Sequence, residues 1–279
     1  MDFAEKSERP VYVVGHKNPD TDSISSAIAY AYLKNTTGTG QYIPARAGQI
    51  NQETQYVLNA FHVEAPIYLD DVMTDARDID MNDIEGVTED VSLKKAWHMM
   101  RDRGDVTLPV VDQGKLTGII TIGDIANAYM DVYDNCILST AKTSYKNILE
   151  TLDAKMIVGS EDGFFESGEV VIATANPDVL EDYIHPGDMV ILGNRYETQL
   201  CAIEMGAACV VISMGAKVSK TIQHFAKEHN CIVINTPYDS FTVARLINQS
   251  MSIGYFMKKE KLTTFRVTDK TEDIRAIMK

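Results

Sequence analysis

The sequence lacks any paired cysteine spacing, any long apolar run and any excess of basic residues. Its four cysteines are scattered along the 279 residues, which predicts small core side chains in a reducing compartment rather than a disulfide framework or a thiolate metal site. No apolar run is long enough to span a bilayer, and the charged N-terminus, MDFAEKSERP, has no apolar signal region. We therefore expect a cytoplasmic protein that has no membrane partner.

Basic residues are scarce relative to acidic ones. The chain contains 26 Lys and Arg against 40 Asp and Glu, a formal net charge of −14. A broad nucleic-acid-binding face needs clustered Lys and Arg, so we expect no nucleic-acid partner. A small phosphate substrate remains compatible with this balance, because bound metal ions supply positive charge locally. The length predicts two or three domains, and the 45% apolar content is enough for sizeable cores.

The most informative segment is VYVVGHKNPDTDSISS, residues 11–26. Its apolar run, Val11–Val14, predicts a strand that feeds the polar turn GHKNPDTDS. An amphipathic helix is expected over residues 25–35, beginning near Ile24. The carboxyl end of such a strand is where open α/β sheets place their ligand sites.

The turn carries His16, Asp20 and Asp22 within seven residues. One imidazole and two carboxylates suit a divalent metal such as Mn²⁺ better than a metal that prefers thiolates. Pro19 stiffens the turn, so the carboxylates can be positioned before the metal arrives. The alternative is an Asp-rich turn that only caps the helix, with Ser23 as the N-cap.

These residues resemble the first metal-binding motif of the DHH phosphoesterase superfamily, and GHKNPDTDS is more similar to the family II, manganese-dependent inorganic pyrophosphatases. The nuclease and nucleotide-phosphatase branches usually carry Gly where Thr21 stands. The resemblance implies a two-metal site, with His16 and Asp20 on one ion and Asp22 on the other. It also implies Mn²⁺ or Co²⁺ as cofactor, Mg²⁺ with the substrate, and hydrolysis of pyrophosphate to two phosphates.

Strands and helices alternate from about residue 10 to residue 70, which predicts the start of a parallel sheet. Strands are expected over 11–14, 42–45 and 67–69, and a second helix over 52–61. A β-α-β-β-α pattern begins at about residue 72, with LPVVDQGKLTGIITIGDI at its centre. This pattern resembles a CBS (cystathionine-β-synthase-type) module.

The string TIGD, Thr121–Asp124, matches the Thr/Ser-x-x-Asp pattern of nucleotide-binding CBS modules. The resemblance implies that Asp124 takes the ribose hydroxyls and Thr121 contacts phosphate, and we expect Thr107 to line the same cleft. The alternative, given equal weight, is a plain helix cap with Thr121 as N-cap. In the preceding helix, Trp97, Met99 and Met100 have helical spacing and are expected in the core.

The strings GNRYETQ, GAACVVISMG and NTPYDSFTVARLI resemble a DRTGG domain in order and context, although the literal DRTGG string is absent. The segment VTEDVSLKKAWHMM at 87–100 recurs approximately as VTDKTEDIRAIMK at 267–279, which predicts the beginning of a second CBS module. The fold class expected is α/β. Its segments are the N-terminal part of a DHH catalytic domain (1–70), CBS module 1 (71–140), a DRTGG domain (141–250) and the start of CBS module 2 (251–279).

The family resemblance also implies an Asp-His-His string, a bridging Asp and a C-terminal substrate domain, and the Asp-His-His string is missing from the sequence. We therefore expect the chain to be truncated at its C-terminus and inactive by itself. The intact protein is expected to be a pyrophosphatase regulated by adenine nucleotides and a homodimer through its CBS modules. The alternatives are an adenine-nucleotide-sensing CBS–DRTGG fragment without catalysis and, less favoured, a DHH-type nuclease or nucleotide phosphatase.

Overall fold

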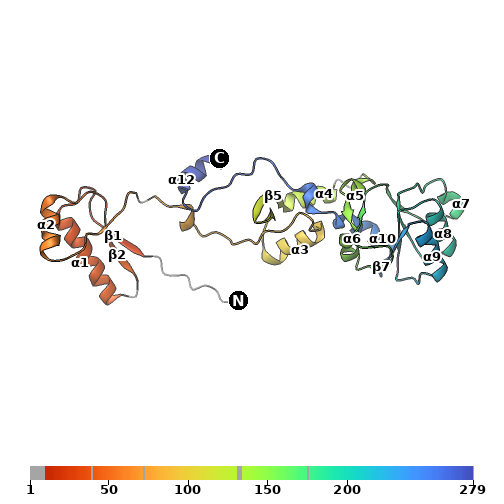
Figure 1. The fold of residues 1–279 in the computed structure, drawn as a ribbon, viewed down its shortest axis with the longest axis horizontal. Helices are drawn as coiled ribbons and strands as arrows, with labels where there is room; N and C mark the ends of the chain where they lie inside the picture. The colour runs from red at the N-terminus through yellow and green to blue at the C-terminus, as the bar shows by residue number, and fades with distance from the viewer. Residues whose placement is uncertain (1–9, 39, 72, 131–133, 175, 279) are drawn as a thin grey trace. The chain divides into compact units, whose positions relative to one another are not determined.

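The computed structural model describes residues 10–38, 40–71, 73–130, 134–174 and 176–278. The chain divides into two units, one made of residues 1–81 with 264–279 and the other of residues 82–263. Figure 1 shows the helices and strands of each. Among the described residues, no helix is long and apolar enough to cross a membrane.

The first unit contains a three-stranded parallel sheet in the order β1-β2-β3. Its elements are β1 (Val11–Val14), α1 (Thr21–Thr37), β2 (Tyr42–Arg46), α2 (Gln52–Ala60) and β3 (Ile67–Tyr68). Helix α1 packs against β1 and β2 and buries Ile24, Ala27 and Ala31. The α/β order and the parallel sheet predicted from the sequence are confirmed.

Helix α1 begins at Thr21 and not near Ile24, as the sequence had predicted. The reason is that Asp20 is the N-cap, because its Oδ1 accepts a hydrogen bond of 2.9 Å from the Ser23 backbone N–H. The alternative N-cap, Ser23, therefore lies inside the helix. Asp22 falls in the first turn, where the helix dipole favours a carboxylate.

The second unit begins with the expected CBS order, except that the first strand of the β-α-β-β-α pattern is reduced to one isolated bridge between Val87 and Val110. The antiparallel hairpin of β4 and β5 packs its buried residues Leu108 and Ile120 into one core with the neighbouring helices. The elements are α3 (Leu93–Arg103), β4 (Thr107–Asp112), β5 (Lys115–Thr121) and α4 (Ile122–Met130).

The DRTGG part is built on a five-stranded sheet in the order β7-β12-β11-β10-β9, with β7 antiparallel to β12 and the other strands parallel. The strands are β7 (Lys155–Val158), β9 (Val170–Ile172), β10 (Met189–Leu192), β11 (Cys209–Ile212) and β12 (Ile232–Asn235). The longer helices are α6 (Tyr145–Thr151), α8 (Tyr196–Glu204), α9 (Lys220–Glu228) and α10 (Ser240–Leu246). Shorter elements are α5 (Ile137–Thr140), β6 (Thr143–Ser144), β8 (Phe164–Phe165), α7 (Pro177–Leu180), the 3₁₀ helix η2 (Ile247–Ser250) and α11 (Ile253–Phe256).

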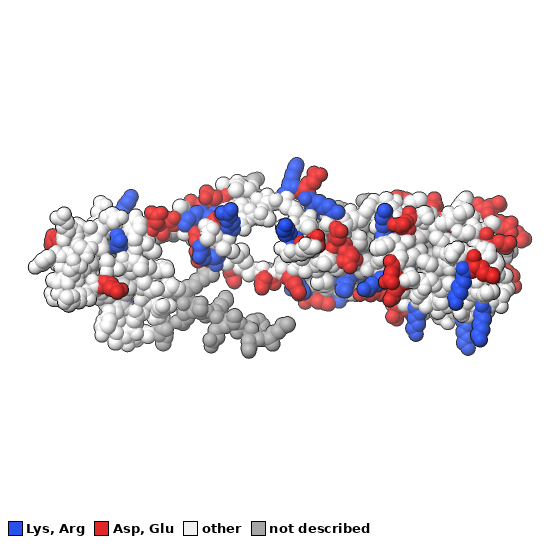
Figure 2. Space-filling model, in the orientation of Figure 1, with Lys and Arg blue, Asp and Glu red and all other residues white. Residues whose placement is uncertain are grey.

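The two faces of this sheet bury alternate residues, as strands covered by helices on both sides require. Val190 and Leu192 of β10 pack in one core with residues of α8 and α9, whereas Met189 and Ile191 pack in the core that contains α6 and α10. Figure 1 shows α8 and α9 to the right of β7 and α6 to its left. Over α8 and α9, acidic side chains lie beside basic ones (Figure 2).

The cysteines are free thiols, as the scattered spacing predicted. Cys201, Cys209 and Cys231 are buried, while Cys136 is half-buried. Burial raises the pKa of Cys209 well above its ordinary value and that of Cys231 to about 12. These two thiols are therefore packing residues and not nucleophiles.

The two copies of the internal repeat form the same backbone ladder, one in each unit. In the second unit, the start of α3 pairs with the segment that leads into the second copy, and Ser92 and Ser252 form the central antiparallel bridge. In the first unit, the start of α12 (Thr271–Ile277) pairs in the same way with the segment before the first copy, around Asp75 and Lys270. In the second unit, the backbone N–H groups of Leu93, Ile253 and Gly254 donate to the carbonyls of Met251, Val91 and Glu89, respectively. In the first unit, the N–H groups of Thr271, Ala76 and Arg77 donate to the carbonyls of Thr74, Asp269 and Val267. The segment at 267–271 therefore occupies the same structural role as the start of the first CBS module.

Candidate functional site

The turn after β1 brings an imidazole and a carboxylate together at the carboxyl end of the strand. The Nε2 atom of His16 lies 3.4 Å from Oδ1 of Asp20, and both side chains are exposed, at 59% and 61%. The hydrogen bond from the Ser23 N–H, followed by the charge of His16, lowers the pKa of Asp20. This carboxylate is therefore ionised at neutral pH and free to accept a cation.

The turn is held tightly against the first turn of α1. A Cβ at Gly15 would collide with the hydroxyl of Ser23, so any larger residue at this position requires the Ser23 side chain to move. The Ser23 Oγ is buried and has no hydrogen-bond partner among the described residues. The backbone between the strand and His16 is thus fixed by packing rather than by a network of hydrogen bonds.

Asp22 is exposed on the first turn of α1, two residues beyond the capping carboxylate. Within the described part of the chain, no group of three or more His, Cys, Asp or Glu side chains is arranged to hold a metal ion. The structure therefore joins two of the three predicted ligands, His16 and Asp20, and leaves Asp22 outside that pair.

The three residues predicted to bind nucleotide lie together in the CBS module. Thr107 of β4 pairs directly with Thr121 at the end of β5, and Asp124 lies one turn into the adjacent helix. The Oδ2 atom of Asp124 accepts from the Thr121 N–H at 2.9 Å and from its hydroxyl at 2.7 Å. The Asp124 N–H donates back to the Thr121 hydroxyl at 3.2 Å. In the chain alone, these residues form a reciprocal helix cap, which was the simpler alternative.

Sequence reasoning missed a cation at this cap. The Nζ of Lys258 lies 3.3 Å from Oδ1 of Asp124, whose side chain is only 14% exposed. Burial by itself raises the pKa of Asp124, but the hydrogen bonds from Thr121 and the contact with Lys258 outweigh it, so the pKa is lowered. No local pattern could have paired these residues, because the DRTGG domain separates them in the sequence.

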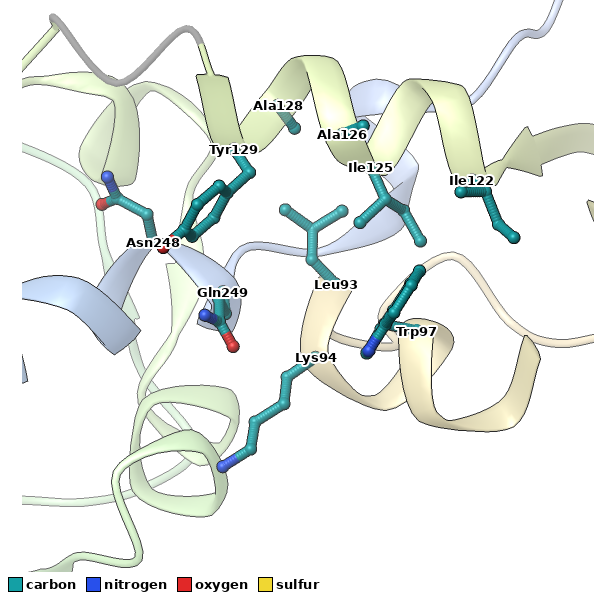
Figure 3. Close-up of a pocket in the computed structure, with 10 residues that line it drawn as sticks. All are labelled: Leu93, Lys94, Trp97, Ile122, Ile125, Ala126, Ala128, Tyr129, Asn248 and Gln249. Atoms are coloured by element: carbon teal, nitrogen blue, oxygen red, sulfur yellow. The ribbon is translucent and has the colours of Figure 1, made fainter. Parts of the chain in front are cut away.

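A cavity of about 370 Å³ lies between α3, α4 and η2. Figure 3 shows the rings of Trp97 and Tyr129 on opposite sides of Leu93, with Asn248 and Gln249 at one end. Trp97 is 40% exposed, so its predicted core position is wrong, whereas Met100 is fully buried as predicted. The indole faces the open cavity because α3 presents only its Leu93, Ala96 and Met100 face to the core.

The comparisons with known proteins identify a CBS domain and a DRTGG domain in this chain. The CBS domain family matches residues 71–131, and the DRTGG domain family matches residues 147–250. A crystal structure of the CBS and DRTGG domains of the regulatory region of Clostridium perfringens pyrophosphatase, complexed with the activator diadenosine tetraphosphate, matches with a TM-score of 0.69. It is 37% identical, and the match covers 73% of this chain and 89% of that one. The chain belongs to the inorganic pyrophosphatases that carry a CBS–DRTGG regulatory region.

Two curated pyrophosphatases match along almost the whole chain. The cobalt-dependent inorganic pyrophosphatase of Clostridium perfringens is 41% identical over 96% of this chain and 49% of its own length. A probable manganese-dependent inorganic pyrophosphatase of Thermotoga maritima is 33% identical over 98% of this chain and 50% of its own length. The chain thus spans about half the length of the relatives it matches.

Proposed function

We propose that the whole protein hydrolyses pyrophosphate to two phosphates at a two-metal site to which this chain contributes His16, Asp20 and Asp22. The observation that supports this most is the 3.4 Å pairing of His16 with Asp20 at the carboxyl end of β1. The metal dependence in the names of the two relatives, cobalt in one and manganese in the other, points to the same chemistry.

The donor set fits such an ion in part. An imidazole nitrogen and an ionised carboxylate suit Mn²⁺ or Co²⁺, and their separation is that of two ligands on one centre. When bound, the metals supply positive charge for the phosphoryl oxygens and hydroxide near neutral pH. The pyrophosphate is expected to arrive with Mg²⁺.

Single substitutions in the protein encoded by the whole gene test this function. His16→Ala and Asp20→Ala should each lower turnover by several orders of magnitude, because a two-metal clamp fails when either ion is lost. His98→Ala is the matched control, since His98 is exposed on α3 and far along the chain from the turn. Metal binding, measured by Mn²⁺ electron paramagnetic resonance, should weaken in the same two variants. Full turnover in His16→Ala would refute the assignment.

We further propose that adenine nucleotides regulate the enzyme by binding at Thr107, Thr121 and Asp124. A carboxylate that can accept two hydroxyls beside a threonine at a helix N-terminus suits a ribose and a phosphate. In the intact protein, Asp124→Ala should weaken AMP and ATP binding by roughly 1–3 kcal/mol, because polar groups lose a partner. Calorimetry measures this directly, and unchanged affinity would leave the residues as a helix cap alone.

The open cavity around Trp97 supports a homodimer through the CBS modules. In such a dimer, the apolar residues that line the cavity in one copy would pack against the equivalent residues of a second copy. An isologous interface places equivalent patches against each other, and a large exposed apolar surface marks an interaction site. Trp97→Glu should shift the mass measured by light scattering to that of a monomer, whereas Tyr255→Glu, a control outside the cavity, should not. A cytoplasmic location completes this proposal.

For the 279 residues by themselves, we propose nucleotide sensing without catalysis. The specific observation is that the described residues offer no third ligand grouped with His16 and Asp20, while Asp124 keeps one oxygen, Oδ1, that Thr121 does not occupy. This chain should show no pyrophosphatase activity with Mn²⁺ or Co²⁺. Turnover that survives repurification and disappears in His16→Ala would contradict this.

A further inference from the structure

Lys258 is held beside the proposed nucleotide site by its backbone. Its N–H donates to the Ile119 carbonyl at 2.9 Å, and its own carbonyl accepts from the Ile119 N–H at 3.1 Å. A Cβ at Gly118 would meet Met257 Sδ at 2.6 Å and Lys258 O at 3.1 Å, so the segment approaches β5 as closely as a glycine allows. The Cα of Lys258 is therefore fixed next to the end of the hairpin.

The two oxygens of Asp124 are used differently. Oδ2 accepts both hydrogen bonds from Thr121, which leaves Lys258 as the partner of Oδ1. Oδ1 is the oxygen that Thr121 does not use, so a ribose hydroxyl that approaches it competes with the lysine for the same atom. Its side chain is 60% exposed, and an ion pair with such an exposed partner is easily broken.

A nucleotide that displaces Lys258 from Asp124 brings its own phosphate into the same space. The protein is strongly acidic, with a formal net charge of −14, so an anionic ligand needs a local cation. The adjacent Lys259 lies 3.9 Å from Glu89 and points its charge to another carboxylate. Lys258 is thus a cation already held in ion-pair contact with the Thr121–Asp124 cap.

We propose that Lys258 is the phosphate-recognition residue of the nucleotide site and exchanges its ion pair with Asp124 for one with the nucleotide phosphate. This inference rests on the proposed nucleotide binding at Thr121 and Asp124. The exchange makes the site prefer nucleotides to nucleosides. A nucleoside breaks the resting ion pair without replacing it, whereas a nucleotide supplies a new partner for the lysine.

The test compares AMP with adenosine by titration calorimetry on the protein encoded by the whole gene. Lys258→Met keeps the apolar stem and removes the charge, and it should weaken AMP binding by about tenfold, the value of one charge-assisted contact. Adenosine should bind as well as before or more tightly, because Asp124 no longer has a competing partner. The matched control, Lys259→Met, should leave both affinities unchanged.

Several outcomes would overturn the proposal, and they are separable. Equal AMP affinity in Lys258→Met and wild type removes the lysine from the site while the proposed nucleotide binding survives. Equal weakening of AMP and adenosine in Lys258→Met assigns the lysine a purely structural role. If wild type binds neither ligand, or if Asp124→Ala binds AMP as tightly as wild type, the nucleotide site itself is wrong and this inference falls with it.

Discussion

Replacing Asp124 tests how much the Thr121–Asp124 cap contributes to the stability of the second unit. Asp124→Ala removes two hydrogen bonds to Thr121 and the contact with Lys258. Loss of a helix cap costs about 1 kcal/mol, hydrogen bonds to a charged group contribute about 1.5–3 kcal/mol, and the ion pair with an exposed lysine adds about 0–1 kcal/mol. Because these contributions overlap, we expect the free energy of unfolding to fall by about 2–3 kcal/mol.

Thermal unfolding at pH 7 measures this loss. For a unit of this size each kcal/mol shifts the midpoint by about 2–4 °C, so Asp124→Ala should unfold roughly 4–12 °C lower than wild type. Asp124→Asn keeps an acceptor for Thr121 and loses the charge, and it should cost about 1 kcal/mol. The control Asp102→Ala removes an exposed carboxylate of α3 and should change stability by no more than about 0.5 kcal/mol.

The stability that Asp124 contributes should depend on pH, and the direction of its pKa shift fixes whether that stability is lost in acid or in base. The pKa of Asp124 is lowered in the folded chain, so the unfolded chain, with an ordinary pKa of about 3.9, takes up the proton first. The stabilisation is complete above that pH and is lost as the pH falls through the folded value. The gap between wild type and Asp124→Ala should therefore narrow in acid. A gap that is absent at pH 7, or that stays constant down to pH 2, would refute this reasoning.

Three other substitutions test packing. Gly15→Ala should displace the turn from α1 and weaken Mn²⁺ binding even though no ligand is changed, and unaltered binding would show that the turn tolerates a side chain. Leu108→Ala, at a fully buried position, should lower the free energy of unfolding by about 3 kcal/mol, whereas the exposed Val106→Ala should change it by less than about 0.5 kcal/mol in the same urea titration. Gly118→Ala should push Met257 away from β5 and reproduce the nucleotide selectivity of Lys258→Met; retention of wild-type selectivity would contradict the close packing of that segment.

Much of the fold could be predicted from the sequence because strands and helices impose different spacings on apolar residues. The strand Val11–Val14 lies where a short apolar run indicated it, and Tyr42–Arg46 begins at the predicted residue. The start of α1 was misplaced because Asp20 is both a helix cap and a candidate ligand, and the sequence does not rank these roles. The exposure of Trp97 was missed because spacing places it on a helix face without stating which face is covered.

The site was predictable only where its residues are close in the chain. His16 and Asp20, or Thr121 and Asp124, lie within one turn of each other, so local patterns reveal them. Lys258 reaches Asp124 through tertiary packing against β5, and no spacing rule encodes that contact. Similarly, the repeat was visible as similar strings, but its reciprocal pairing with the segments before each copy depends on three-dimensional structure.

The close packing of α6 on η2 has a consequence for how this chain can vary. The first helix of the DRTGG domain contacts its last helical turn. The domain is therefore an insertion whose two ends lie side by side where they connect to the CBS module. The entropic cost of bringing the two ends of such an insertion together grows only with the logarithm of its length, by about 0.6 kcal/mol for each doubling. The face of this domain that carries α6 and α10 shares one hydrophobic core with the CBS hairpin and must keep its packing, whereas the α8 and α9 side has a core of its own. That far side is therefore where the regulatory region can lengthen or acquire new surface at little cost to the CBS module.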